Sequence, residues 1–184
     1  RAEFENIKAK NTTVQSLKSV FEKKLKRLIQ RNPLRTDFQR HYEEIIAEYN
    51  REKDRQNIEA IFEALLKFVE ELDEEESRAV REGLDEETLA IFDLLKKPDL
   101  DAKDIKIIKK VAKELLKTLK DKMSKMYRFQ DKEPTCDAIK VTIRDFLYSD
   151  KTGLPVSSYS EKDVNKITEE VFYHVYRAYP TMPS

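Results

Sequence analysis

Glycine is nearly absent from this chain: Gly83 and Gly153 are the only two among 184 residues, where average usage of about 7% predicts about thirteen. Loops that cradle nucleotide phosphates need several closely spaced glycines, so neither a P-loop nor a dinucleotide-binding turn can be written with these two positions. A sandwich or barrel of many strands also needs more turn glycines. The scarcity of glycine therefore excludes these classes and favours a helical protein.

The rest of the composition describes a charged, helix-forming module. Charged residues make up 39% of the chain, against about 25% in an average soluble domain. The single cysteine, Cys136, excludes an internal disulfide and a cysteine-rich zinc site, and it fits a reducing cytoplasm. No apolar run approaches the roughly 18 residues of a membrane span, and no signal peptide is visible. We expect no membrane association, and the missing initiator methionine indicates a piece of a longer chain.

Hydrophobic residues recur every three or four positions, the spacing of one face of a helix. We therefore predict an all-α, irregular multi-helix fold of about seven or eight helices, with little or no strand. One of these, capped by Asp101, is expected to be the longest helix and to lie centrally. A short helix is expected from the acidic run at 73–76, because acids favour the positive end of the helix dipole. The hydrophobic stripes cover residues 14–28, 38–49, 58–72, 89–95, 105–119, 139–147 and 164–179.

Capping and stop signals mark the expected helix ends. Residues 11–13, Asp85 and Ser160 can accept hydrogen bonds from the N–H groups of a first helical turn, so we expect them to begin helices. Pro33 and Gly83 are expected to end helices, because the residue before proline avoids the helical region and glycine tolerates a left-handed cap.

The segment 135–148 fits two patterns. Ile139, Val141 and Ile143 alternate with polar residues as in a strand, whereas Ile139, Ile143 and Leu147 form an equally good helical face. We predict a helix, because a single strand would have no partner to pair with.

The chain carries no net charge, but its charges are separated into blocks. Residues 8–40 hold ten Lys and Arg against two acids, a net of +8, and residues 70–93 hold eleven acids against two Arg, a net of −9. As domain organisation we expect one domain over residues 1–184, with a basic helical arm at 1–50 and a helical body at 51–184.

The basic block has two interpretations. Its cations can pair with the acidic block inside the fold, which needs no outside partner, or they can contact DNA phosphates without reading base sequence. Both interpretations use the same side chains, so the sequence leaves them open. The candidate contacts with DNA or an acidic partner are Lys18, Lys23, Lys24, Lys26, Arg27, Arg31, Arg35 and Arg40.

Side chains that could carry chemistry are few, and we predict no catalytic, cofactor-binding or metal-binding residue. His41 and His174 lie far apart in sequence, and His41 is expected to be a partly exposed helix histidine. Cys136 lies near an expected helix start, where the dipole can lower a thiol pKa, but a small half-buried residue is the stronger interpretation. The string 98–103 resembles a nuclease motif, yet its acids crowd into one turn before a helix instead of converging on metal ions.

Aromatic residues gather near the C-terminal end of the chain. Phe172, Tyr173, Tyr176 and Tyr179 offer more apolar surface than one helix face usually buries. Tyr173 and Tyr176 lie three apart and so share a face. Either all four complete the core, or Tyr173 and Tyr176 form a candidate subunit interface.

Several longer stretches give the chain a family resemblance over essentially all its residues. They are Ile7–Val14, Arg31–Phe38, Glu43–Asn50, Val141–Tyr148 with Gly153–Pro155, and Phe172–Pro180. In order and spacing they resemble the helical C-terminal region of the restriction (R, motor) subunit of type I restriction–modification enzymes.

The resemblance implies the setting in which such a region works. The R subunit is an ATP-dependent DNA translocase and endonuclease with a nuclease domain, two motor lobes and this helical tail. Its ATP and Mg²⁺ belong to the other parts, so no cofactor and no catalytic residue carries over to this chain, which is not expected to be an enzyme by itself. The implied partners are the methyltransferase and specificity subunits and the motor lobes of its own subunit, with DNA contact possible. The implied location is the cytoplasm of a bacterium or archaeon, and the implied role is assembly.

Overall fold

The structure is a computed structural model that describes the backbone of residues 2–51 and 58–179, and side chains from residue 8 onward. These parts form seven α-helices and two short 3-10 helices, without any strand, which confirms the all-α prediction. The chain divides into two compact units, Arg1–Gly83 and Leu84–Ser184. The expected boundary between arm and body at residue 50 therefore lies inside the first unit, and each unit is described by itself.

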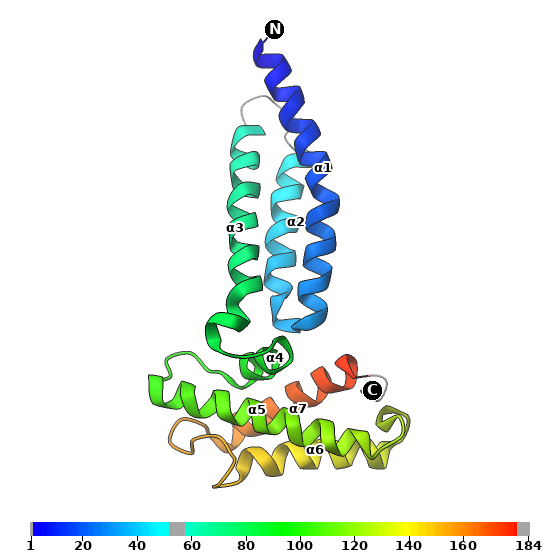
Figure 1. The fold of residues 1–184 in the computed structure, drawn as a ribbon, viewed down its shortest axis with the longest axis vertical. Coiled ribbons are helices and arrows are strands. Elements are labelled where there is room, and N and C mark those ends of the chain that lie inside the picture. The colour runs from blue at the N-terminus through cyan, green and yellow to red at the C-terminus, as the bar shows by residue number, and fades with distance from the viewer. Residues whose placement is uncertain (1, 52–57, 180–184) are drawn as a thin grey trace. The chain divides into compact units, whose positions relative to one another are not determined.

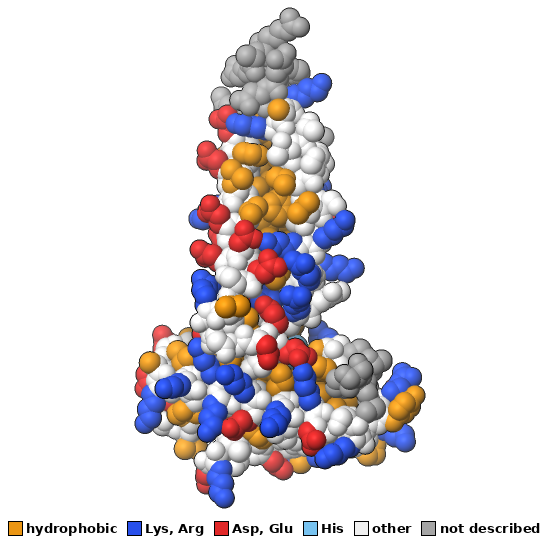
Figure 2. Space-filling model, viewed as in Figure 1, with side chains coloured by type: hydrophobic (Ala, Val, Ile, Leu, Met, Phe, Trp, Pro, Cys, Tyr) orange, Lys and Arg blue, Asp and Glu red, His pale blue; other side chains and the backbone are white. Residues whose placement is uncertain are grey.

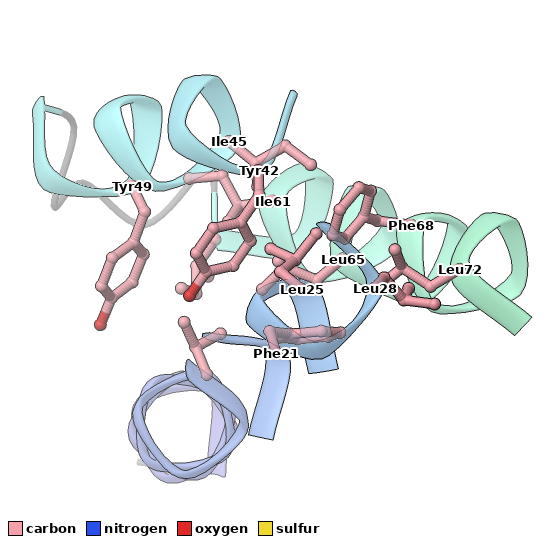
Figure 3. Packing of buried hydrophobic residues seen from close by; sticks show 12 residues of the cluster. Phe21, Leu25, Leu28, Tyr42, Ile45, Tyr49, Ile61, Leu65, Phe68 and Leu72 are labelled. Carbon is pink, nitrogen blue, oxygen red and sulfur yellow. The ribbon is translucent and has the colours of Figure 1, made fainter. Parts of the chain in front are cut away.

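The first unit is a bundle of three helices (Figure 1). Helix α1 covers Ala2–Arg31, α2 covers Thr36–Arg51 and α3 covers Ile58–Glu82, while the short 3-10 helix η1, Pro33–Arg35, joins α1 to α2. The hydrophobic stripes of the three helices meet in one buried core. Figure 3 shows ten of its residues converging from all three helices: Phe21, Leu25, Leu28, Tyr42, Ile45, Tyr49, Ile61, Leu65, Phe68 and Leu72.

Two expected helix starts in this unit are wrong. Residues 11–13 lie inside α1, where the hydroxyls of Thr12 and Thr13 donate to the carbonyls of Lys8 and Ala9 at 3.0 and 2.9 Å instead of capping a terminus. The acidic run at 73–76 continues α3, because its carboxylates pair with cations of α1 and η1.

The helix stops are confirmed. Asn32 accepts a hydrogen bond from the N–H of Leu34 at 3.1 Å, and Pro33 opens η1. Gly83 follows α3 with φ of +68°, a left-handed conformation that strains any residue with a Cβ.

The second unit contains the other four α-helices. They are α4 (Glu86–Leu95), α5 (Ala102–Ser124), α6 (Glu133–Tyr148) and α7 (Glu161–Ala178), with the 3-10 helix η2 (Phe129–Asp131) between α5 and α6. Helix α4 packs against α5 and α7, and α6 packs against the same two helices (Figure 1). Asp85, Asp101 and Ser160 cap α4, α5 and α7 as predicted.

The prediction that α5 is the longest helix is wrong, because it has 23 residues whereas α1 has 30 and α3 has 25. The helical prediction for residues 135–148 is confirmed by α6. Ile139, Ile143 and Leu147 form its buried face, whereas Val141, the middle residue of the alternative strand pattern, is 45% exposed. Neighbouring helices α5 and α7 cover that buried face.

Candidate interaction surfaces

Within residues 2–51 and 58–179, no three His, Cys, Asp or Glu side chains are grouped so as to hold a metal ion. None of the described helices is both long and apolar enough to cross a membrane. His41 is an exposed helix residue as predicted, with Nδ1 3.5 Å from a carboxylate oxygen of Glu71.

Cys136 is a partly buried residue whose thiol lies 3.4 Å from the carbonyl of Phe129. Partial burial, together with the negative charge of Asp137, raises the pKa of this thiol above its ordinary value. A raised pKa disfavours the thiolate that a nucleophile needs. The surroundings of Cys136 therefore favour a small half-buried residue over a reactive thiol.

The C-terminal half of α7 presents two tyrosines on its outer side. Helix α7 begins with a capping box, in which Ser160 and Asp163 each accept from the other's backbone N–H. Its buried stripe includes Val171, Phe172 and Val175, and this leaves Tyr173 58% and Tyr176 41% exposed. Of the two alternatives for the aromatic cluster, Phe172 completes the core while Tyr173 and Tyr176 do not.

Contacts beneath the two tyrosines hold them in place. The Tyr176 ring packs edge-on against buried Phe129 at 6.4 Å between centroids, and against Phe172 at 5.9 Å. The Arg177 guanidinium carbon lies 5.4 Å above the centre of the Tyr173 ring, within range of a cation–π interaction. The Tyr176 ring is therefore held against two buried rings, whereas the Tyr173 ring has the exposed Arg177 over it.

Tyr179, just after α7, is tied to the start of α4. Its hydroxyl donates to a carboxylate oxygen of Glu87 at 2.8 Å, and the same glutamate pairs with Lys120 of α5 at 2.5 Å. Partial burial, and then the hydrogen bond to Glu87, raises the pKa of the Tyr179 hydroxyl well above its usual range. Tyr179 therefore joins three helices of this unit and belongs to its scaffold.

Sequence periodicity missed two residues of the segment between α5 and α6, Tyr127 and Gln130. Tyr127, in the link between α5 and η2, is 83% exposed, and Gln130 of η2 donates to the carbonyl of Tyr179 at 2.5 Å. Both lie between helices, so no hydrophobic stripe marks them. The ring contact between Phe129 and Tyr176 could not be recognised before η2 was placed against α7.

His174 sits on the same helix but faces inward, with 7% of its surface exposed. Burial, and then the neighbouring Arg177, lowers the pKa of its imidazole below the ordinary value of 6.5. The unfolded chain therefore binds a proton more readily than the folded one.

Because of this shift, the free energy of unfolding should fall as the pH drops through about 6.5 toward the lower folded pKa. His174→Phe should flatten that pH dependence, since the buried position then holds no titrating group. Urea unfolding of both proteins between neutral and mildly acidic pH measures the difference. An identical slope with and without His174 would contradict the assignment.

Three of the candidate basic residues, Lys24, Arg27 and Arg35, pair with the acidic segment of α3. Lys24 forms ion pairs with Asp73 and, at 3.0 Å, with Glu76, and Arg27 reaches Glu76 at 2.8 Å. The hydrogen bond from Lys24 lowers the pKa of the Glu76 carboxyl. These side chains therefore pair with the opposite charge block inside the first unit.

Arg35 is the most deeply placed of the candidates, with 2% of its surface exposed. Its Nε donates to Glu75 at 2.8 Å and one terminal nitrogen donates to the Leu28 carbonyl at 3.2 Å. Arg78 binds the other side of the same carboxylate at 2.9 Å. Arg35 therefore joins η1 to α1 and α3 inside the bundle.

The remaining basic candidates lie at the surface of the first unit. Arg40 is exposed and pairs with Asp37 one turn earlier. Lys23, Lys26 and Arg31 are exposed and Lys18 is half-buried, and these four form no ion pair with another described side chain. Lys23 and Lys26 lie three apart on α1, so they share a face.

Each unit has a hollow lined by described residues. The larger, about 560 Å³, lies between α5 and the loop 149–160. Gly153 shapes this loop, because a Cβ there would lie 2.3 Å from the Leu147 carbonyl oxygen and 2.4 Å from that of Ser149. The smaller, about 320 Å³, lies between α2 and α3 and is floored by Ile45 and Ile61. The lining of the smaller hollow also includes His41, Glu44 and Glu48.

Comparison with known proteins places this helical region in a family. None of the curated proteins and none of the solved structures matches the chain. The family described as "Type I restriction enzyme HindI endonuclease subunit-like, C-terminal" matches residues 1–179, nearly the whole chain. This is the family that the resemblance in the sequence predicts. The chain thus belongs to the C-terminal region of HindI-like type I restriction enzyme endonuclease subunits.

Proposed function

We propose that this region is an assembly module that docks the R subunit onto the methyltransferase and specificity subunits of a type I restriction complex. In this proposal ATP hydrolysis, translocation and DNA cleavage belong to the other parts of the subunit, and the helical region carries no catalytic centre. Family membership supports the setting, and the glycine-poor sequence contains no phosphate-binding loop.

The observation that carries the proposal is the exposed aromatic surface of α7. Tyr173 and Tyr176 are 58% and 41% exposed, although the helix beneath them is firmly packed. Tyrosines held rigid on a scaffold are enriched at the energetic centres of protein interfaces, because they offer large contact area at low cost in conformational entropy. Arg177 over the Tyr173 ring adds the second residue type enriched at such centres.

Changing Tyr173 and Tyr176 together to alanine should leave the folded region intact and weaken its assembly. We expect the melting temperature to move by only a few degrees, because both rings are largely outside the core. Binding to the methyltransferase–specificity complex should weaken by about a hundredfold or more, since losing two central tyrosines costs at least about 3 kcal/mol. A pull-down followed by calorimetric titration measures the effect.

Tyr148→Ala provides the matched control for this double variant. Tyr148 is also a tyrosine of the second unit and is 42% exposed, but its hydroxyl lies at the opposite end of α7, 3.4 Å from Asn165. Tyr176 follows Asn165 by eleven residues, about 16 Å along the helix. Equal losses in both proteins, or unfolding of the double variant, would contradict an interface centred on Tyr173 and Tyr176.

The second candidate function is contact with the DNA backbone through α1. It is favoured by Lys23, Lys26 and Arg31, which are exposed and form no ion pair with another described side chain. Phosphate contacts of this kind weaken steeply with salt, because binding releases condensed counterions.

Changing these three residues to alanine should reduce the affinity for duplex DNA and also reduce the salt slope by up to about three units. Fluorescence anisotropy with labelled duplex across a salt series measures both quantities. Arg40→Ala serves as the control, because Arg40 is exposed but already paired with Asp37. Affinity that does not depend on salt would remove this second function.

A further inference from the structure

Three ion pairs define how α1 and α3 lie against each other. Lys10 pairs with Glu59, Lys24 with Asp73 and Arg27 with Glu76, and each pair is separated by 49 residues. A constant separation means that the two helices run parallel and stay in register over this length. The partner of any residue on this side of α1 is therefore found by adding 49.

Between these ion pairs the same register brings apolar residues together. Leu17 faces Leu66, seven residues after the first ion pair and seven before the second, and Val20 faces Val69. A step of seven returns to nearly the same side of a helix. Leu17 and Val69 are partly buried and pack on the core, whereas Val20 is 59% and Leu66 48% exposed.

Val20 and Leu66 are thus exposed apolar side chains at a level of the bundle that lies between two of the ion pairs. Scattered exposed hydrophobic residues are ordinary on protein surfaces, whereas contiguous apolar patches mark contact surfaces. The register places Val20 and Leu66 beside the half-buried Leu17 and Val69, so the four form one small contiguous patch. Figure 2 shows hydrophobic side chains gathered on the first unit, with acidic side chains along one edge and basic ones toward the other. We name Leu17, Val20, Leu66 and Val69 the apolar strip.

Charges beside the apolar strip differ between its two edges. On α3, Leu66 is flanked one turn away by Glu63 and Glu70, both exposed. On α1, Val20 is flanked one turn away by the exposed Lys23. The next residue, Lys24, is already paired with acids of α3. The edge of the strip on α3 is therefore acidic and the edge on α1 is basic, so the two edges can be told apart by their charge.

This pattern is complementary to itself under one kind of two-fold rotation. An axis parallel to the helices brings α1 of a second copy over α3 of the first, so that the basic edge meets the acidic edge on both sides. An axis across the helices would instead bring α1 over α1 and place like charges together. We propose that the apolar strip pairs with the same strip of a second copy of this chain, with the helices of the two copies parallel.

The proposed interface is small, so the expected association is weak. The exposed apolar area comes mainly from Val20 and Leu66 of each copy, far below the interface of a permanent dimer. Dimers should therefore appear only toward the upper end of a micromolar concentration series, and added salt should weaken them. This inference does not depend on the docking role proposed for α7.

Sedimentation velocity on the 184-residue chain over such a series tests the pairing. Val20→Lys combined with Leu66→Glu replaces the two exposed apolar side chains of the strip with charged ones. Both positions are largely outside the core, so the fold should persist while dimerisation weakens by at least about tenfold. Leu34→Glu is the control, because Leu34 is 47% exposed and lies on η1 away from the strip. Circular dichroism checks that all three proteins keep their helices.

Two chains with different single cysteines then test the orientation. In a Cys136→Ser background, one chain carries Ser16→Cys, one turn before Val20, and the other carries Glu63→Cys, one turn before Leu66. Parallel pairing predicts disulfides between positions 16 and 63 of different chains in preference to disulfides between two copies of position 16. Preference for the latter would overturn the charge argument.

Two further outcomes overturn the proposal itself. A chain that stays monomeric throughout the series has no such interface. A monomeric chain whose Val20→Lys/Leu66→Glu variant loses binding to the methyltransferase complex would assign the strip to that partner. In either case the double tyrosine variant on α7 still reports separately on the docking role.

Discussion

Replacing Arg35 with methionine should lower the free energy of unfolding by about 3 kcal/mol. The guanidinium is 2% exposed and its carboxylate partner, Glu75, has a side chain that is 11% exposed. Methionine fills most of the space but supplies no donor, so Glu75 keeps its buried charge with fewer partners. Removing one member of a buried pair costs about 3–5 kcal/mol, and Arg78 at 2.9 Å from the same carboxylate keeps the expected value at the low end.

Arg40→Met is the matched control for this substitution. Arg40 pairs with Asp37, but their side chains are 70% and 77% exposed, so the pair contributes between zero and about 1 kcal/mol. Urea unfolding followed by circular dichroism should therefore separate the two variants clearly. Combining Arg35→Met with Glu75→Leu should recover part of the lost stability, because both buried charges are then gone. Equal stability of the Arg35 and Arg40 variants would show that Arg35 is not a buried structural cation.

Helix starts and stops in this fold could be predicted from the sequence where they depend on interactions within one helical turn. Asp85, Asp101 and Ser160 cap helices because a short oxygen-bearing side chain satisfies nearby N–H groups wherever the helix begins. Gly83 ends α3 because glycine accepts a positive φ without strain. These effects act within a few residues, so no knowledge of the tertiary fold is needed.

The wrong helix start at 73–76 shows where local reasoning stops. Acids at a helix N-terminus and acids that pair with another helix look the same in sequence. The difference lies in Lys24 and Arg35, which are 49 and 40 residues away from their acidic partners Asp73 and Glu75. Only the packing of α1 and η1 against α3 reveals it.

Prediction of the candidate interaction residues from sequence met the same limit, because their exposure depends on the tertiary fold. Arg35 and Lys23 are both cations of the basic block, yet one is buried and the other is exposed. Charge counts cannot separate them, because exposure depends on which helix face meets the core. The exposed position of Tyr173 and Tyr176 likewise required α7 to be rotated correctly against α4 and α6.

The largest expected loss of stability comes from Phe68→Ala in the core of the first unit, about 3–5 kcal/mol. Phe68 is fully buried, and its ring lies 6.0 Å from that of Phe21, 5.9 Å from that of Tyr42 and 5.3 Å from that of His41. Alanine removes this ring from the centre of an aromatic cluster drawn from all three helices. The cavity that remains cannot close without moving those helices, which is why the cost exceeds that of transfer alone.

Leu66→Ala on the same helix is the control, because Leu66 is 48% exposed and its truncation should cost less than about 1 kcal/mol. Hydrogen exchange then shows where the loss occurs. Amides of α1, α2 and α3 should lose protection in Phe68→Ala, whereas those of α5, α6 and α7 should keep it, since the second unit has its own buried residues. Uniform loss of protection along the chain would mean instead that both units unfold together, as the single domain expected over residues 1–184 would do.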